Sequence, residues 1–229
     1  MKKYRKLLFD VDNTLLDFDE AERNGIRKVL EAYGEIPDEG KLALYSSINA
    51  SLWKAYERGE IVRDTIMETR FQLFFDRLGK QINGQKAEEL YRAQLDASAV
   101  MIEGAQELLD VLAPEYELYV ITNGVSETQY RRLKTSGIDR YMKGIFVSED
   151  AGFQKPRKEF FEYCFSRMED PDPSGMLVIG DSLSSDIRGG NAAGIDTCWF
   201  NRKGESGMEG ITVTYEIHRL EELERLLKV

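Results

Sequence analysis

The sequence is poor in the residues that several common kinds of site require. Of its 229 residues only two are cysteines, Cys164 and Cys198, and only one is a histidine, His218. Two cysteines without a CxxC spacing form no disulfide framework and favour a reducing compartment, so we expect a cytoplasmic protein. A single histidine argues against a Ser-His-Asp triad and against a histidine-based zinc site.

Long apolar runs and net positive charge are missing as well. The opening MKKYRKLLFD holds an apolar run of three residues, whereas a secretory leader carries about 7–15 and a membrane span about 18. Lysine and arginine number 31 against 41 acidic residues, which leaves a net charge of −10. We therefore expect neither a membrane nor a nucleic-acid polymer as a partner. A small phosphate ester stays possible if the protein supplies positive charge locally.

Short apolar runs alternate with helical patterns over most of the chain. The runs that read as buried strands are YRKLLFD, ELYVIT, GIFVS, MLVIGD and IDTCWF. This alternation indicates βαβ units and a parallel sheet. Between residues 17 and 97 only helical patterns occur. The sequence predicts an α/β, Rossmann-like core over residues 1–16 and 98–229, with an inserted all-helical domain over 17–97.

Local signals place some of the helix ends. SETQYRRLKTSG reads as a helix with Ser126 as its N-cap and Gly137 just beyond its end. SDIRGGNAAG reads as a helix that ends at a glycine, and NRKGESGMEG (201–210) reads as a loop.

Polar or charged residues follow each of four predicted strands. Ligands bind at the carboxyl ends of the strands in parallel α/β sheets, so these residues should gather at one edge. They are Asp10, Asp12, Thr122, Asn123, Lys155, Asp181 and Asp186. Several carboxylates brought together repel one another unless they share a cation. Hard oxygen ligands around an open site suit Mg²⁺, and Lys155 adds further positive charge.

Each of these motifs also has an ordinary structural explanation when it is taken alone. Asp and Asn favour turns, so Thr122-Asn123-Gly124 alone indicates a turn, and Lys155 alone indicates a surface lysine. Asp181 alone is compatible with a helix cap. The joint pattern of four motifs in one chain order, each after an apolar run, is what points to a site.

Four segments, DVDNT, ITN, KP and GDSLSSD, resemble the four motifs of the haloacid dehalogenase superfamily of phosphohydrolases, in the same order. The helical stretch between the first two resembles that superfamily's type-1 cap. Longer runs, above all DIRGGNAAGIDTCWFN, look like the pyrimidine 5′-nucleotidase family that acts on standard and non-standard nucleoside monophosphates. Glu103 and Lys158 stand where the broader superfamily often has proline, and neither departure touches the chemistry.

The resemblance implies a phosphoryl-transfer role for the first motifs. Asp10 would attack phosphorus and form an aspartyl-phosphate. Asp12 would protonate the leaving oxygen and then deprotonate the attacking water. Thr122, Asn123 and Lys155 would hold the phosphoryl oxygens.

The resemblance also implies a magnesium site. Its ligands would be Asp10, the backbone carbonyl of Asp12, and Asp181. Asp186 would orient bound water or Lys155. A dehalogenase needs neither Mg²⁺ nor a second acid, so the presence of Asp12 and Asp181 points away from that branch.

The predicted helical domain would close over the site and read the leaving group. Its aromatic and basic candidates for substrate contact are Phe18, Trp53, Tyr56, Arg70, Phe71 and Phe75. The phenylalanines at helical spacing favour packing inside that domain, so Phe18 and Trp53 are the two that we name.

The leading interpretation is a Mg²⁺-dependent 5′-nucleotidase that acts on a pyrimidine nucleoside monophosphate. Alternatives are a phosphatase of phosphoglycolate or a sugar phosphate, a mutase of the same superfamily, and a phosphate-sensing module without turnover. A pure binder has no need of Asp12, which argues against the last. The substrate, the base preference and the choice between monomer and homodimer stay open.

Overall fold

The structure is a computed structural model that describes residues 3–228. The chain divides into two compact units. The first comprises the residues up to Asp17 together with those from Ala99 onward, and the second is Phe18–Ser98. Within the described residues, no helix is long and apolar enough to cross a membrane.

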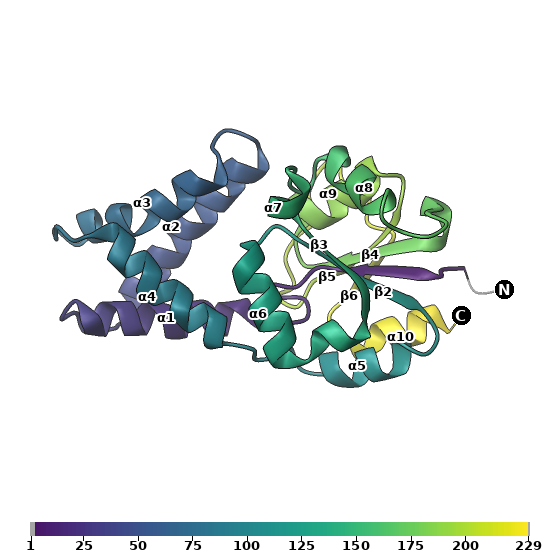
Figure 1. The fold of residues 1–229 in the computed structure, drawn as a ribbon, viewed down its shortest axis with the longest axis horizontal. Helices are drawn as coiled ribbons and strands as arrows, with labels where there is room; N and C mark the ends of the chain where they lie inside the picture. Colours follow the sequence, from purple (N-terminus) through teal and green to yellow (C-terminus); the bar gives the residue numbers. More distant parts are fainter. Residues whose placement is uncertain (1–2, 229) are drawn as a thin grey trace. The chain divides into compact units, whose positions relative to one another are not determined.

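The first unit is built on a parallel sheet of six strands in the order β3-β2-β1-β4-β5-β6 (Figure 1). The strands are β1 (Lys6–Phe9), β2 (Glu117–Thr122), β3 (Met142–Val147), β4 (Met176–Gly180), β5 (Asp196–Phe200) and β6 (Tyr215–Ile217). Every residue of the central strand β1 is buried, as its apolar run predicts. The prediction of an α/β, Rossmann-like sheet with a helical insert is confirmed.

Helices cover both faces of this sheet. They are α5 (Ala105–Leu112), α6 (Ser126–Ser136), α7 (Ser148–Ala151), α8 (Lys158–Phe165), α9 (Arg188–Ala192) and α10 (Glu221–Leu227). Side chains alternate between faces along a strand. Leu7 and Phe9 of β1 therefore share a core with α5, α6 and α10, whereas Leu8 packs in a second core with α8.

The second unit consists of α1 (Phe18–Ala32), α2 (Glu39–Glu57), α3 (Arg63–Arg77) and α4 (Gly84–Ala97). Its own core includes Phe71, Phe74 and Phe75, which lie on one side of α3 as their spacing predicts. Helices α1 and α4 approach closely at Gly25, where a Cβ atom would stand 2.8 Å from the Tyr91 ring. The four helices thus pack around a core that is separate from those of the sheet.

A network of buried polar side chains crosses the helical unit. Arg70 donates two hydrogen bonds to the carboxylate of Glu88, at 2.7 and 2.6 Å, and a third to Asn49 at 3.1 Å. Asn49 and Ser46 in turn donate to the two carboxylate oxygens of Glu22. Each carboxylate oxygen in this network therefore has a donor.

The start of α6 differs from the sequence prediction. The N-cap is Val125, and Ser126 is the first residue inside the helix. The backbone N–H of Ser126 donates to the Glu149 carboxylate at 2.8 Å, and its hydroxyl donates to Asp150 at 2.8 Å. Acids from the segment after β3 supply the capping that was predicted for the serine, because negative charge is favourable at a helix N-terminus.

Two further elements differ from the sequence prediction. The helix predicted for SDIRGGNAAG is a π-helical turn, Leu183–Ile187, followed by the short α9. Strand β6 follows the 201–210 loop and was not predicted, since three residues are too few to show a strand period.

Candidate active site

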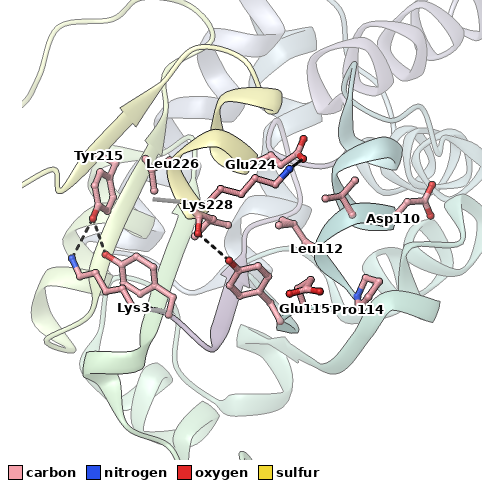
Figure 2. A pocket seen from close by; sticks show the side chains of 13 residues that line it. Lys3, Asp110, Leu112, Pro114, Glu115, Tyr215, Glu224, Leu226 and Lys228 are labelled. Atoms are coloured by element: carbon pink, nitrogen blue, oxygen red, sulfur yellow. Dashed lines mark hydrogen bonds and ion pairs between the residues drawn. The ribbon is translucent and has the colours of Figure 1, made fainter. Parts of the chain in front are cut away.

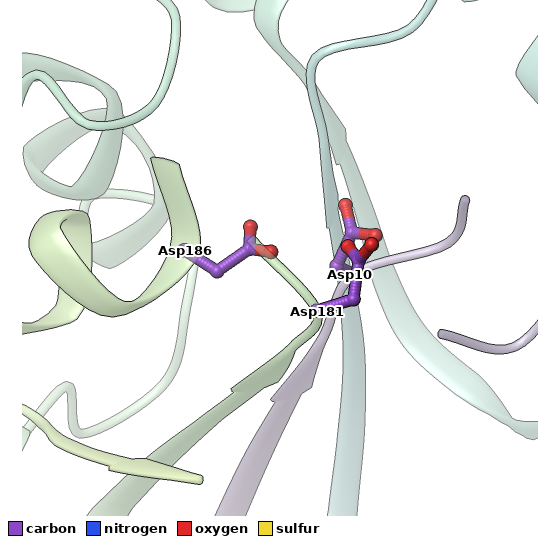
Figure 3. Close-up of side chains that lie close together, drawn as sticks. All are labelled: Asp10, Asp181 and Asp186. Carbon is purple, nitrogen blue, oxygen red and sulfur yellow. The ribbon is translucent and has the colours of Figure 1, made fainter. Parts of the chain in front are cut away.

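Asp10 and Asp181 lie directly after the neighbouring central strands β1 and β4. Strand order runs outward from this pair in opposite directions, through β2 and β3 on one side and β5 and β6 on the other. Such a reversal leaves a crevice outside the strand ends, where ligands bind in open α/β sheets. The carboxylates of Asp10, Asp181 and Asp186 meet here, with one oxygen of each within 4.8 Å of the others (Figure 3).

Asp186 reaches this cluster from the π-helical turn Leu183–Ile187. Gly180 at the end of β4 leaves the space that the side chain needs, because a Cβ at that position would stand 2.2 Å from Asp186 Oδ2. The same oxygen accepts a hydrogen bond from the Ser182 backbone N–H at 3.1 Å. A glycine and a tight turn therefore place the third acid.

Lys155 brings the positive charge of the cluster. Its side chain is 1% exposed, and its Nζ lies 2.7 Å from both Asp10 Oδ1 and Asp186 Oδ1. Nζ also donates to the Ile121 carbonyl at 2.8 Å. The Asn123 side chain accepts from the Lys155 N–H at 2.8 Å and donates to the Lys155 carbonyl at 2.9 Å. Asn123 thus fixes the backbone that carries the lysine.

Two more contacts order the strand ends. The buried Thr122 hydroxyl oxygen accepts from the Gly124 N–H at 3.1 Å and from Gln129 Nε2 at 3.2 Å. Trp199 in β5 donates its indole N–H to the Asp181 backbone carbonyl at 2.8 Å. Trp199, a buried residue of β5, therefore holds the strand end that bears Asp181.

The cluster holds more negative charge than its one lysine compensates. Burial, together with repulsion from Asp186 and Asp12, raises the pKa of Asp10 to about 7, although the attraction of Lys155 acts to lower it. Burial, followed by repulsion from Asp10 and Asp186, raises the pKa of Asp181 well above its ordinary value. Burial opposes the charge on Lys155, but Asp10 and Asp186 outweigh it and raise the lysine pKa. Without a further cation, these carboxyls hold protons more tightly than ordinary ones.

Asp12 has a different environment from the other acids. Its Oδ1 forms an ion pair with Arg132 Nη1, and its Oδ2 accepts a hydrogen bond from Gln129 Nε2 at 2.5 Å. Both partners come from α6 and are buried. Sequence reasoning missed these two residues. The available signal was their three-residue spacing on one side of a helix that begins just after the Thr122-Asn123-Gly124 motif.

The candidates in the helical unit divide by exposure. Arg70, Tyr56, Phe71 and Phe75 are buried inside that unit. Phe18 and Trp53 are half-buried, and the Trp53 ring lies 5.8 Å from that of Tyr56. Arg70 is committed to its pair with Glu88. Phe18 and Trp53 therefore keep accessible surface, and their contact with substrate stays a prediction.

A cavity of about 1130 Å³ lies elsewhere in the sheet-containing unit (Figure 2). Its lining includes Tyr4, Tyr116 and Tyr215, which precede or begin β1, β2 and β6. The cavity is therefore at the amino ends of the strands, whereas Asp10 and Asp181 follow their carboxyl ends. It takes no part in the acidic cluster.

Comparison with known proteins identifies the family of the chain. The profile of the family described as haloacid dehalogenase-like hydrolase matches residues 7–200. The chain belongs to this family. It is 44% identical to the HAD-hydrolase YfnB of Bacillus subtilis, over 100% of this chain and 97% of that protein. A crystal structure of YfnB bound to magnesium has a TM-score of 0.95 and covers 100% of both chains.

Two other relatives carry a more specific name. The pyrimidine 5′-nucleotidase PynA of Streptococcus pneumoniae is 36% identical over 96% of this chain and 93% of that one. The pyrimidine 5′-nucleotidase YjjG of Escherichia coli is 32% identical over 98% of each. The predicted resemblance to the superfamily and to its nucleotidase branch is confirmed, as is the prediction of a hydrolase.

Proposed function

We propose that this protein is a Mg²⁺-dependent phosphomonoesterase that hydrolyses pyrimidine nucleoside 5′-monophosphates through an aspartyl-phosphate. One combined observation carries the proposal. A chain 36% and 32% identical to enzymes named pyrimidine 5′-nucleotidase also gathers three carboxylates and a buried lysine at the switch point of its sheet. The likeness supports the substrate class, and the cluster supports the chemistry.

The acidic cluster fits a magnesium ion. Its donors are carboxylate oxygens, which Mg²⁺ prefers, and the raised pKa values of Asp10 and Asp181 indicate a site that lacks positive charge. Asp10, Asp181 and the backbone carbonyl of Asp12 would hold the ion, with Asp186 supporting it and Lys155. Bound there, Mg²⁺ would offset the charge on the phosphoryl oxygens.

The residues of the cluster divide the chemistry between them. The Asp10 carboxylate bonds to phosphorus while the ester oxygen leaves, and the Asp12 carboxyl gives that oxygen its proton. Asp12 then takes a proton from water, whose oxygen bonds to phosphorus and releases Asp10. The proton that Asp12 donates in the first step is thus restored in the second.

Positioning groups surround the reacting carboxylate. Lys155 lies 2.7 Å from Asp10 and can bridge it to a phosphoryl oxygen. The Thr122 hydroxyl and the Asn123 backbone amide are the further donors that we assign to the phosphoryl group. Phosphoryl transfer depends mainly on such positioning and charge stabilisation.

A substrate panel tests the proposal. Phosphate release from UMP, dUMP, dTMP, purine monophosphates, phosphoglycolate, a hexose phosphate and p-nitrophenyl phosphate is measured with Mg²⁺ and with EDTA. We expect kcat/KM for the pyrimidine nucleotides to exceed that of the other esters by about tenfold or more. EDTA should abolish turnover. Preference for phosphoglycolate or the hexose phosphate would retain the chemistry and refute the nucleotidase assignment, and full turnover in EDTA would refute the metal.

A further inference from the structure

We propose that Gln129 and Arg132 are positioning residues that hold the Asp12 carboxyl in the one orientation from which it exchanges protons with the reacting oxygens. The inference rests on the proposed function, because it assigns these residues to the proton-transfer part of that chemistry. Neither belongs to the four strand-end motifs.

The contacts define both oxygens of Asp12. Arg132 pairs with Oδ1, and Gln129 Nε2 lies 2.5 Å from Oδ2. One donor on each oxygen fixes the plane of the carboxyl group and its direction from the backbone. A carboxylate oxygen has two lone pairs, so one position on each oxygen stays available for a proton.

The two donors are themselves held rigidly. The Arg132 side chain is 1% exposed and Gln129 is 2% exposed, although both are polar residues on a helix. Gln129 Nε2 is shared with the Thr122 hydroxyl at 3.2 Å, which anchors it to the end of β2. Side chains locked by burial and by a second contact can orient a third group with little loss of freedom during reaction.

Gly124 supplies an independent indication that the position of Gln129 matters. A Cβ at Gly124 would stand 2.1 Å from Gln129 Nε2 and 2.7 Å from its Cγ. The glycine of the Thr122-Asn123-Gly124 motif thus leaves the space through which Gln129 reaches Asp12. The opposite end of the amide, Oε1, is buried without a hydrogen-bond partner in the described part of the chain. In this orientation of the Gln129 amide, its Nε2 contacts Asp12 and Thr122, and its Oε1 is left without a hydrogen bond among the described residues.

Leaving-group dependence separates a positioning role from a structural one. A nucleoside 5′-oxygen must receive a proton as it leaves, whereas p-nitrophenolate leaves without one. Because kcat/KM covers the steps up to release of the leaving group, a misplaced Asp12 should reduce it for UMP and spare it for p-nitrophenyl phosphate. Loss of general acid catalysis lowers a rate by about 10²–10⁴-fold. The fall in kcat/KM for UMP in the positioning variants should not exceed this factor.

The experiment compares Gln129→Met, Arg132→Lys, Arg132→Met and Gly124→Ala in the full chain with Mg²⁺. Asp12→Asn sets the upper limit of the effect. We expect kcat/KM for UMP to fall about 10–100-fold in Gln129→Met and Arg132→Met, and that for p-nitrophenyl phosphate less than about threefold. Arg132→Lys should recover part of the loss, and Gly124→Ala should reproduce the Gln129→Met pattern.

Arg131→Met is the matched control, since Arg131 is the exposed neighbour of Arg132 on the same helix and pairs with Glu127. Arg131→Met should leave kcat/KM unchanged for both substrates. An equal fall in kcat/KM for the two substrates in folded Gln129 and Arg132 variants would overturn the inference. Unchanged kcat/KM for UMP in these variants would overturn it as well. If Arg132→Met fails to fold, Gly124→Ala and Gln129→Met carry the test. A wild-type protein that hydrolyses neither ester with Mg²⁺ would instead refute the proposed function.

Discussion

Two groups of buried charged side chains, one in each unit, differ in how fully they are compensated. In the helical unit, Arg70 pairs with Glu88, and neutral donors cover both oxygens of Glu22. At the strand ends, three aspartates lie together, and Lys155 is hydrogen-bonded to two of them, Asp10 and Asp186. A network whose acceptors all have donors stabilises a fold without assistance, whereas an excess of buried acid fits the binding of a further cation. The comparison separates a structural cluster from the cluster that we propose to be reactive.

The largest effect is expected from Asp10→Asn. The substitution removes the carboxylate that we propose as the nucleophile, and with it one charge of the crowded cluster. We expect phosphate release to fall at least about 10⁴-fold. The metal-free variant should unfold at the same temperature as the parent or higher, because repulsion within the cluster is relieved. Turnover equal to that of the parent, measured side by side, would refute nucleophilic Asp10.

Arg70→Met tests the structural cluster. It leaves the Glu88 carboxylate buried without its partner, and breaking such a pair costs about 3–5 kcal/mol of unfolding free energy. The urea midpoint should fall accordingly, while kcat with p-nitrophenyl phosphate changes little in the folded protein. Adding Glu88→Leu should restore most of the stability. If kcat falls and stability does not, Arg70 is part of the reactive machinery and the comparison is wrong.

The response to pH should differ with and without metal. The pKa of Asp10 is raised from 3.8 to about 7 by burial, so the folded state keeps a proton that the unfolded chain has lost. A raised carboxyl pKa contributes stability at low pH that is lost as pH rises through about 7. The melting temperature of the metal-free protein should therefore fall as pH rises from about 4 to 7, relative to the melting temperature of Asp10→Asn.

Magnesium should reverse that trend, because it replaces the protons on the acids. We expect the rise in melting temperature with saturating Mg²⁺ to be larger at about pH 8 than at about pH 5. Calorimetry at both pH values measures it. A rise of equal size at both, or its persistence in an Asp10→Asn/Asp181→Asn double variant, would contradict the assignment of these acids.

The smallest effect is expected from Trp53→Ala. If the half-buried indole contacts the nucleoside, KM for UMP should rise about three- to tenfold, and p-nitrophenyl phosphate should be unaffected. Trp53→Phe should keep most of the affinity. An identical change for both substrates would assign Trp53 to packing within the helical unit.

Much of the strand-end site could be predicted from the sequence, and the reason is geometric. Apolar runs such as Leu7–Phe9 identify buried strands, and parallel pairing brings the residues after each run to one edge. Asp10, Lys155 and Asp186 are therefore found together although they come from three separate segments. The division into a sheet and a helical insert follows from the change in hydrophobic period in the same way.

The remaining contacts could not be predicted from periodicity. The partners of Asp12 lie 117 and 120 residues away, on a helix whose polar residues look solvent-exposed in the sequence. Glu149 and Asp150 cap α6 from another segment, so the local signal at Ser126 misplaces the cap. The pair of Arg70 with Glu88 likewise joins two helices. These contacts depend on tertiary packing, which a single sequence does not encode as a period.

The most direct test of the central claim uses Asp12→Asn with p-nitrophenyl phosphate and Mg²⁺. The leaving group departs without a proton, but no group remains to activate water, so the phosphorylated enzyme should accumulate. We predict a burst of about one p-nitrophenolate per protein, with a phosphoryl group on the peptide that contains Asp10. Both should vanish in EDTA and in Asp10→Asn/Asp12→Asn. A burst with the phosphoryl group on another residue, or steady turnover without a phosphorylated protein, would contradict the account.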